Sequence, residues 1–199
     1  IALRLPSFEN PGRGAAKPVP RVELESADCS RFVLQRFDDL TVAPSSALVR
    51  VRLALCGVRP ISNVVDVSNY VMLETGQPLH FYDASKVSES RLLVRDARPG
   101  ERLETLDGVE RALTPVALII ADASRPLGLA GVMGGATSEV GDSTRAILLE
   151  AASFDGARVR RTAQLFGLRT EASGRHERSI PPVLAELAAA RAAQMIVAL

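Results

Sequence analysis

The side chains best able to do chemistry gather between Arg59 and His80. This stretch holds an arginine, the neighbouring pair Ser68 and Asn69, and one of only two histidines in the chain. A neutral imidazole can orient a water molecule or take its proton, and hydroxyl and amide groups can hold that water by hydrogen bonds. These residue types suit a cleft that activates water, although a structural role for a lone histidine is equally compatible with the sequence.

Glu150 is a second candidate, because it ends the apolar run 146–150 that predicts a buried strand. Removing a carboxylate from water costs free energy unless the group is hydrogen-bonded or ion-paired. The simplest interpretation places Glu150 at a strand end in water or beside an arginine. The alternative is that it accepts a hydrogen bond from a ligand hydroxyl.

Three further features are less specific. His176 lies in the charged run 175–178, which predicts a solvated surface and makes it the weaker of the two histidines as a candidate. The glycine-rich connection 128–135 has neither a Gly-Lys-Ser/Thr sequence nor a dinucleotide fingerprint, so we interpret its glycines as allowing tight turns or close backbone approach to a ligand. The arginines at 158, 160 and 161 could meet phosphates or pair with surface carboxylates, and both interpretations stay open.

The elements that must position these residues follow from periodicity and from start and stop signals. Residues 64–73 have helical apolar spacing, and Gly76 and Pro78 end the helix, so His80 is expected in a loop just past it. Strands are expected at 22–24, 32–37, 91–95, 117–121 and 147–150, a hairpin over 103–113 turning at Asp-Gly, and further helices from Ser45 or Ser46 to Leu55, from Asp155 to Gly167, and after Pro181-Pro182. This order predicts an α+β fold, strand-rich, with mixed or antiparallel sheets packed with several helices as a layered ββα-type sandwich.

The amino-acid composition excludes several classes of protein. The chain has 199 residues, a hydrophobic fraction of 47% and a net charge of +1, so it is not a nucleic-acid-binding polycation. Cys29 and Cys56 have no metal-ligand spacing and are expected to be buried thiols of a reducing compartment. The sequence shows no signal peptide and no membrane-spanning run. The chain starts without Met, and we expect it to be a piece of a longer protein.

Several segments together resemble the editing module, formed by the third and fourth domains, of the bacterial phenylalanyl-tRNA synthetase beta subunit. The resemblance covers about residues 20 to 180 in unbroken order. It rests on the motifs Arg59-Pro-Ile-Ser-Asn-Val-Val-Asp-Val-Ser-Asn-Tyr-Val, Gly76-Gln-Pro-Leu-His80, Leu106-Asp-Gly-Val-Glu110, Leu129-Ala-Gly-Val-Met-Gly-Gly135, Leu148-Leu-Glu150 and the stretch 161–178. It implies a linker at 1–19, the editing module at 20–180, and a C-terminal helix at 181–199 leading to a following domain.

Such modules hydrolyse tyrosine mischarged onto tRNA(Phe), and the resemblance implies roles for individual residues. Glu150 would read the tyrosine hydroxyl, and Gly134 and Ala172 would shape the side-chain pocket. Asn69, His80 and Thr170 would lie near the ester and its water. Arg59 would bind substrate, and Ser68 stands where the family usually has Thr, so it keeps a water-orienting hydroxyl but lacks a methyl group. His176 and Ser179 depart from the family's usual aromatic residue and glycine.

The resemblance also implies partners. The whole enzyme, a cytoplasmic class II phenylalanine-tRNA ligase, would use ATP and Mg²⁺ and pair with an alpha subunit in an alpha2-beta2 heterotetramer, while this segment would need neither cofactor nor metal. No membrane partner is expected. The competing hypotheses are a non-catalytic scaffold that docks the alpha subunit or tRNA, and a freestanding editing protein.

Overall fold

The computed structural model describes residues 19–199, so most of the expected linker 1–19 lies outside the described residues. Along the chain the helices are α1 (Ala47–Leu55), α2 (Asn63–Thr75), α3 (Gly156–Leu165), α4 (Glu171–His176) and α5 (Val183–Val197). The strands are β1 (Arg21–Leu24), β2 (Cys29–Phe37), β3 (Leu79–Asp83), β4 (Arg91–Asp96), β5 (Arg102–Glu104), β6 (Glu110–Ala112), β7 (Leu118–Ala121), β8 (Pro126–Leu129), β9 (Met133–Gly134) and β10 (Ile147–Phe154).

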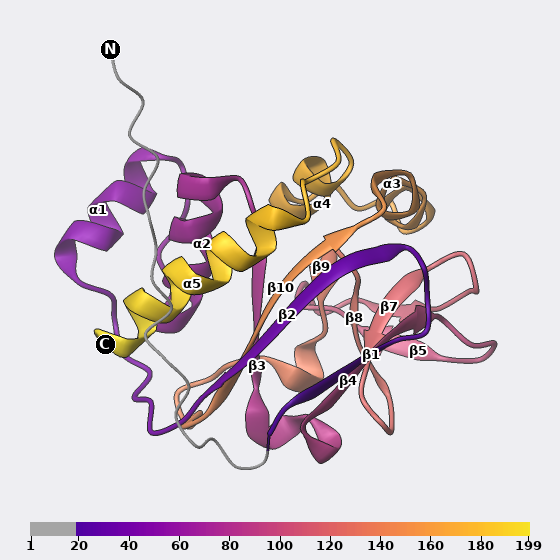
Figure 1. Cartoon of the computed structure of the whole chain (residues 1–199), viewed down its shortest axis with the longest axis horizontal. Helices are drawn as coiled ribbons and strands as arrows, with labels where there is room; N and C mark the ends of the chain where they lie inside the picture. Colours follow the sequence, from indigo (N-terminus) through magenta and orange to yellow (C-terminus); the bar gives the residue numbers. More distant parts are fainter. Residues whose placement is uncertain (1–18) are drawn as a thin grey trace.

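The strands form layers, as the α+β prediction requires. A five-stranded sheet has the order β1-β4-β7-β8-β9, a three-stranded sheet has the order β2-β10-β3, and β5 and β6 make a separate hairpin. Helices α2 and α5 lie against the three-stranded sheet on the side away from the five-stranded sheet, and α1 packs on α2 (Figure 1). The ββα layering predicted from the sequence is therefore confirmed.

Local signals set the helix ends. The side chains of Ser62 and Asp155 accept hydrogen bonds from backbone N–H groups in the first turns of α2 and α3, which satisfies donors that the helix leaves unpaired. Gly76 ends α2 with a φ of 82°, a left-handed conformation that glycine adopts without steric cost. The helices expected over 64–73 and after Asp155 are present at these positions.

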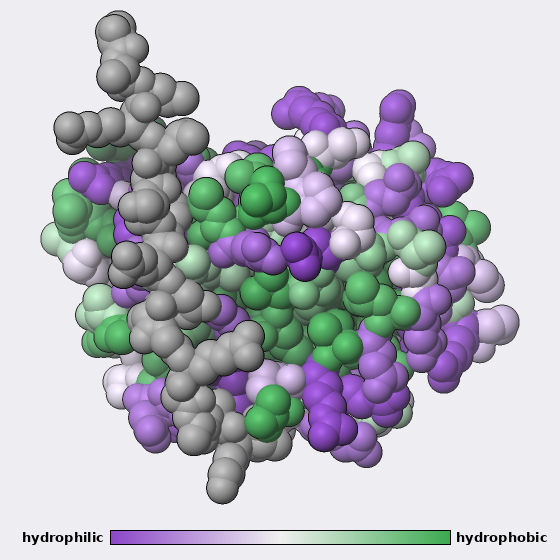
Figure 2. Space-filling model, viewed as in Figure 1, coloured by the Kyte–Doolittle hydropathy of each residue, from purple (hydrophilic) through white to green (hydrophobic). Residues whose placement is uncertain are grey.

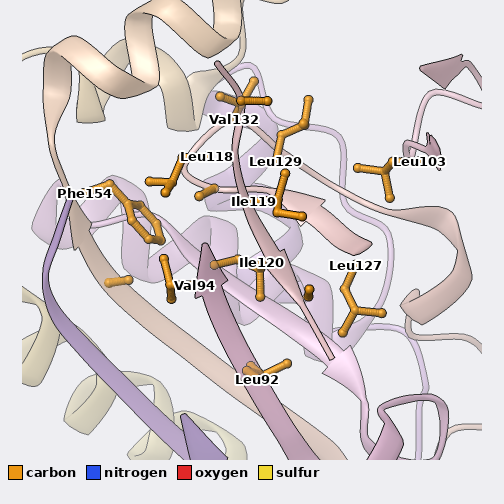
Figure 3. Packing of buried hydrophobic residues seen from close by; sticks show 14 of the residues in the cluster. Leu92, Val94, Leu103, Leu118, Ile119, Ile120, Leu127, Leu129, Val132 and Phe154 are labelled. Atoms are coloured by element: carbon orange, nitrogen blue, oxygen red, sulfur yellow. The ribbon is translucent and has the colours of Figure 1, made fainter. Parts of the chain in front are cut away.

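Strands β3 and β10 separate two hydrophobic cores. Leu148, Ala152 and Phe154 of β10 pack with the five-stranded sheet, whereas the alternate residues Leu149 and Ala151 pack with α2 and α5. Figure 3 shows the first core, where side chains of β4, β7, β8 and β10 converge. Any side chain in phase with Leu148 and Ala152 therefore points into the space between the two sheets.

Strand β2 is an edge of its sheet, and its residues from Phe32 to Phe37 are half-buried. Apolar side chains gather over this middle part of the face in Figure 2, with polar side chains around them. The cysteines differ: Cys29 on β2 is buried, but Cys56 at the end of α1 is exposed, so the expectation that both are buried was wrong for Cys56.

Three expectations about local structure are corrected. His80 lies on strand β3 and not in a loop, because the chain enters the sheet directly after Pro78 and pairs with β10. Glu150 is in the middle of β10 and not at its end. The glycine-rich connection includes the end of strand β8 and all of β9, since Gly128 pairs with Gly134 across a tight hairpin.

Candidate active site

A cavity of about 420 Å³ lies where the two sheets meet the N-terminal end of α4. Its walls are mostly apolar, and polar groups enter from several elements that are far apart in the sequence. The lining residues used below are Asn69 and Met72 of α2, His80 and Tyr82 of β3, Asp107, Gly131 to Gly134 of the β8–β9 hairpin, Glu150 of β10, and Thr170, Ala172 and His176.

Glu150 is the buried acidic group of the cavity, with 7% of the residue exposed. It is in phase with Leu148 and Ala152, so its carboxyl enters the space between the sheets. Its Oε2 accepts a hydrogen bond from the hydroxyl of Tyr82, and Oε1 has no partner among the described residues. Burial raises the pKa of the Glu150 carboxyl to about 7, although the Tyr82 hydrogen bond opposes this rise.

His80 is directly opposite Glu150 in the β3–β10 register, and its ring meets the Tyr82 ring edge to face at 4.5 Å. The residue is half-buried, but its Nε2 atom is shut off from solvent and has no hydrogen-bond partner among the described residues. Burial lowers the pKa of His80 to about 4. The imidazole is therefore neutral at pH 7, so one of its ring nitrogens carries no proton and can accept a hydrogen bond.

The β8–β9 hairpin forms the wall facing His80. A Cβ added at Gly134 would lie 2.7 Å from His80 Nε2 and closer still to Cε1, so only glycine leaves room for the ring. At Gly131 the φ is +68° and an added Cβ would come within 3.0 Å of the His176 ring. The hairpin thus fits closely between two histidines.

Helix α4 lines the cavity beside the β8–β9 hairpin. The Thr170 hydroxyl accepts from the backbone N–H of Ser173 at 3.0 Å and donates to the carbonyl of Val132 at 2.8 Å. This one side chain therefore caps α4 and ties it to the β8–β9 hairpin, with Ala172 lining the cavity beside it.

The structure brings together most of the residues selected from the sequence, but not all of them. Asn69, His80, Gly134, Glu150, Thr170 and Ala172 all line the cavity. Ser68 does not line it, and its hydroxyl donates to the carbonyl of Val65 at 2.7 Å within α2. Arg59 is exposed and also lies outside the cavity wall.

Comparison with known proteins identifies the family. The model of the B3/4 domain family matches residues 28–199, which is most of the chain. The chain belongs to the B3/4 domain family. Relatives of this B3/4 domain include two proteins named phenylalanine–tRNA ligase beta subunit. The one from Moorella thermoacetica is 49% identical, over 88% of this chain and 22% of the relative. The one from Gloeobacter violaceus is 47% identical, over 98% of this chain and 25% of the relative. The chain thus spans about a quarter of the length of these curated relatives.

Among solved structures, this B3/4 domain is similar to an N-terminal fragment of the phenylalanyl-tRNA synthetase beta-subunit from Pyrococcus horikoshii. The TM-score is 0.49 and the identity is 11%, over 84% of this chain and 52% of that chain.

His176 and Tyr82 line the cavity of this B3/4 domain, although the sequence interpretation placed neither of them in the site. His176 was expected on a solvated surface, but it is 2% exposed and lines the cavity. Its ring lies tilted against the Phe154 ring, with the centroids 5.3 Å apart, and burial lowers its pKa to about 4. Tyr82 was not selected at all. Strand alternation would have found it, because it lies two residues after His80 and shares its face of β3.

The surface arginines were left open between two interpretations. Of these, Arg158 pairs with the carboxylates of Asp28 and Asp96 in this B3/4 domain. Within residues 19–199 no group of three His, Cys, Asp or Glu side chains is arranged to hold a metal ion, and no helix is long and apolar enough to cross a membrane.

Proposed function

We propose that this B3/4 domain hydrolyses the ester bond of tyrosine mischarged onto tRNA(Phe), as the editing part of a phenylalanine–tRNA ligase beta subunit. The observation that carries the proposal is the Glu150 carboxyl, buried in an apolar cavity wall with one oxygen free of partners. A cavity of about 420 Å³ accommodates an aromatic side chain, and the names of the curated relatives support the tRNA substrate.

The free carboxyl oxygen explains why such a site would select tyrosine. A pocket shaped for phenylalanine rejects an added hydroxyl only weakly, by about 10²-fold. A second pocket that bonds the hydroxyl discriminates far better, because phenylalanine would cover the cavity and leave Oε1 of Glu150 without a partner. Glu150 therefore supplies the polar group that a two-step selection requires.

The ester is already activated, so the site needs a positioned water more than a strong nucleophile. Neutral His80 can accept a hydrogen bond from that water through the ring nitrogen that carries no proton, and Asn69 can hold it from α2. Water oxygen attacks the ester carbonyl, the ribose hydroxyl of the tRNA leaves with a proton, and free tyrosine results. The Thr170 hydroxyl has its proton engaged with Val132, so it positions the wall near the ester.

The remaining implied features belong to the proposal for the longer protein. ATP, Mg²⁺ and the alpha subunit would serve aminoacylation elsewhere in the synthetase, and no editing step uses them. Arg59 and Ser68 stay predictions from the resemblance, because neither lines the cavity.

Deacylation of tyrosyl-tRNA(Phe) by this domain, with phenylalanyl-tRNA(Phe) as the competing substrate, tests the proposal. Glu150→Ala should remove most of the selectivity, and Glu104→Ala, at an exposed glutamate of β5 outside the cavity, is the matched control. Equal hydrolysis of both substrates by the unaltered domain, or unchanged selectivity in Glu150→Ala, would contradict it. If the isolated domain turns over neither substrate, the same substitution in the full heterotetramer separates a scaffold from a site that needs the rest of the synthetase.

One observation favours the scaffold as a second role. Leu48, Val51 and Leu55 of α1 follow one another at helical spacing and are exposed by 60%, 55% and 82%. An apolar stripe of this kind fits contact with another protein surface. It lies on a helix that contributes no residue to the cavity, so docking and hydrolysis could coexist.

A further inference from the structure

Tyr82 is hydrogen-bonded to Glu150, the buried carboxyl of the cavity. The residue is 1% exposed, lies on β3 in phase with His80, and donates its hydroxyl to Oε2 of Glu150. Burial, followed by the effect of the Glu150 charge, raises the pKa of Tyr82 well above its usual value. The phenol therefore keeps its proton at any physiological pH and acts as a permanent donor.

This hydrogen bond gives the two carboxyl oxygens of Glu150 different roles, one bonded to the protein and one available to a ligand in the cavity. Oε2 is committed to Tyr82, while Oε1 has no partner among the described residues. The tyrosine donor also fixes the direction of the carboxyl group, since a hydrogen bond to an ionised oxygen is strong and directional. A ligand hydroxyl then meets one oxygen in a fixed place, and not a carboxyl free to rotate.

Among the described residues, no cationic side chain of the cavity wall helps Tyr82 to stabilise the ionised Glu150 carboxyl. The lining residues include no arginine or lysine, as far as the described part of the chain shows. The titratable groups that line the cavity with Glu150 are Tyr82 and His80 from β3, His176 and Glu171 from α4, and Asp107 from the loop between β5 and β6. Cys29 of β2 lies close enough for its thiol to be affected by the Glu150 charge. Both histidines are neutral near pH 7, so Tyr82 is the donor that stabilises the ionised carboxyl.

We propose that Tyr82 is a specificity-determining positioning residue: its hydroxyl holds Glu150 so that Oε1 is presented to a phenolic hydroxyl of the ligand. The inference rests on the proposed function for the identity of that ligand. Tyr82 itself makes no contribution to breaking the ester; it acts through Glu150.

Tyr82→Phe keeps the ring and removes the donor, and Tyr70→Phe is a matched control at the only other tyrosine. The Tyr70 hydroxyl meets Arg52 on the exposed side of α2 and does not line the cavity. We expect the Glu150 carboxyl, followed by ¹³C NMR in the labelled domain and assigned by loss of its signal in Glu150→Gln, to titrate about one pH unit higher in Tyr82→Phe. Tyr70→Phe should titrate as the unaltered domain does.

Deacylation gives the second readout. At pH 7 the ratio of tyrosyl to phenylalanyl-tRNA hydrolysis should fall roughly tenfold in Tyr82→Phe, and recover in part near pH 8.5 as the carboxyl ionises again. In the Glu150→Gln background, Tyr82→Phe should change the ratio little, because the residue acts through the lost carboxyl. A merely structural role would produce no recovery with pH.

The outcomes separate the two claims. If the unaltered domain is not selective for tyrosyl-tRNA, in isolation and in the heterotetramer, the proposed function fails and takes the specificity role of Tyr82 with it, even where the NMR midpoint shifts. If the unaltered domain is selective but Tyr82→Phe keeps the same Glu150 midpoint and the same selectivity, the inference fails alone.

Discussion

At the scale of single residues, the closest fit in the cavity is between Gly134 and the imidazole of His80. Gly134→Ala would place a methyl group within 2.7 Å of Nε2, so the ring must move from its place opposite Glu150. We expect deacylation of tyrosyl-tRNA to fall by up to about 10²-fold, because a displacement of this size would misalign the group that, in the proposed reaction, positions water. Single-turnover rates measure the effect.

The control for this substitution is Gly141→Ala. An added Cβ at Gly141 meets nothing within 4 Å, so the same change of side chain should leave the rate unaltered. Equal rates for the two variants would show that the close fit at His80 is not needed for deacylation.

At the scale of secondary structure elements, Thr170 joins α4 to the β8–β9 hairpin through its cap and its hydrogen bond to Val132. Thr170→Val keeps the size of the side chain but loses both hydrogen bonds. We expect the free energy of unfolding to fall by about 1–2 kcal/mol, as for loss of a helix cap. Urea denaturation measures the change.

Thr170→Ser retains the hydroxyl and serves as the conservative variant. It should keep most of the unfolding free energy that Thr170→Val loses. If Thr170→Val is as stable as the unaltered domain, the hydroxyl does not hold these two elements together.

At the scale of the whole molecule, three titratable groups that line the cavity, His80, His176 and Glu150, contribute to how stability changes with pH. The folded pKa values of His80 and His176 are lowered from 6.5 to about 4, so each contributes stability above pH 6.5 that is lost as the pH falls toward 4. Glu150 has the opposite sign, since its folded pKa is raised from 4.5 to about 7. It contributes stability below pH 4.5 that is lost as the pH rises through 7.

These opposing effects predict a measurable slope. Near the middle of the range between pH 4.5 and 6.5 the unfolded chain binds about one proton more at each histidine and about one fewer at Glu150. The free energy of unfolding of the unaltered domain should therefore fall by about 1.4 kcal/mol for each unit of acidification. In Glu150→Gln the compensating group is gone, so the slope should double to about 2.8 kcal/mol per unit.

Urea denaturation at several pH values between 4.5 and 6.5 checks this prediction. Glu104→Gln, at the exposed glutamate of β5, should retain the slope of the unaltered domain. Equal slopes for Glu150→Gln and Glu104→Gln would mean that Glu150 is ionised in the folded protein across this range.

The sequence by itself determined the elements whose signals are local. Ser62 and Gly76 delimit α2, Asp155 begins α3, and Asp107-Gly108 turns the β5–β6 hairpin, each through contacts within a few residues. The motif residues that line the cavity were also found from sequence, through the family resemblance. Helix α4 was missed, because its six residues have no apolar period. Its cap, in which the Thr170 hydroxyl accepts a hydrogen bond from the Ser173 N–H, is seen only in the structure.

Only the tertiary structure decided which side chains meet. His80 and Glu150 are 70 residues apart and become neighbours because β3 and β10 pair in one register, which also brings Tyr82 to the carboxyl. His176 looked like part of a solvated charged run, yet the fold buries it against Phe154 and the hairpin. Burial and the resulting pKa values depend on contacts between distant segments, and these are set by the packing of two sheets and not by the local sequence.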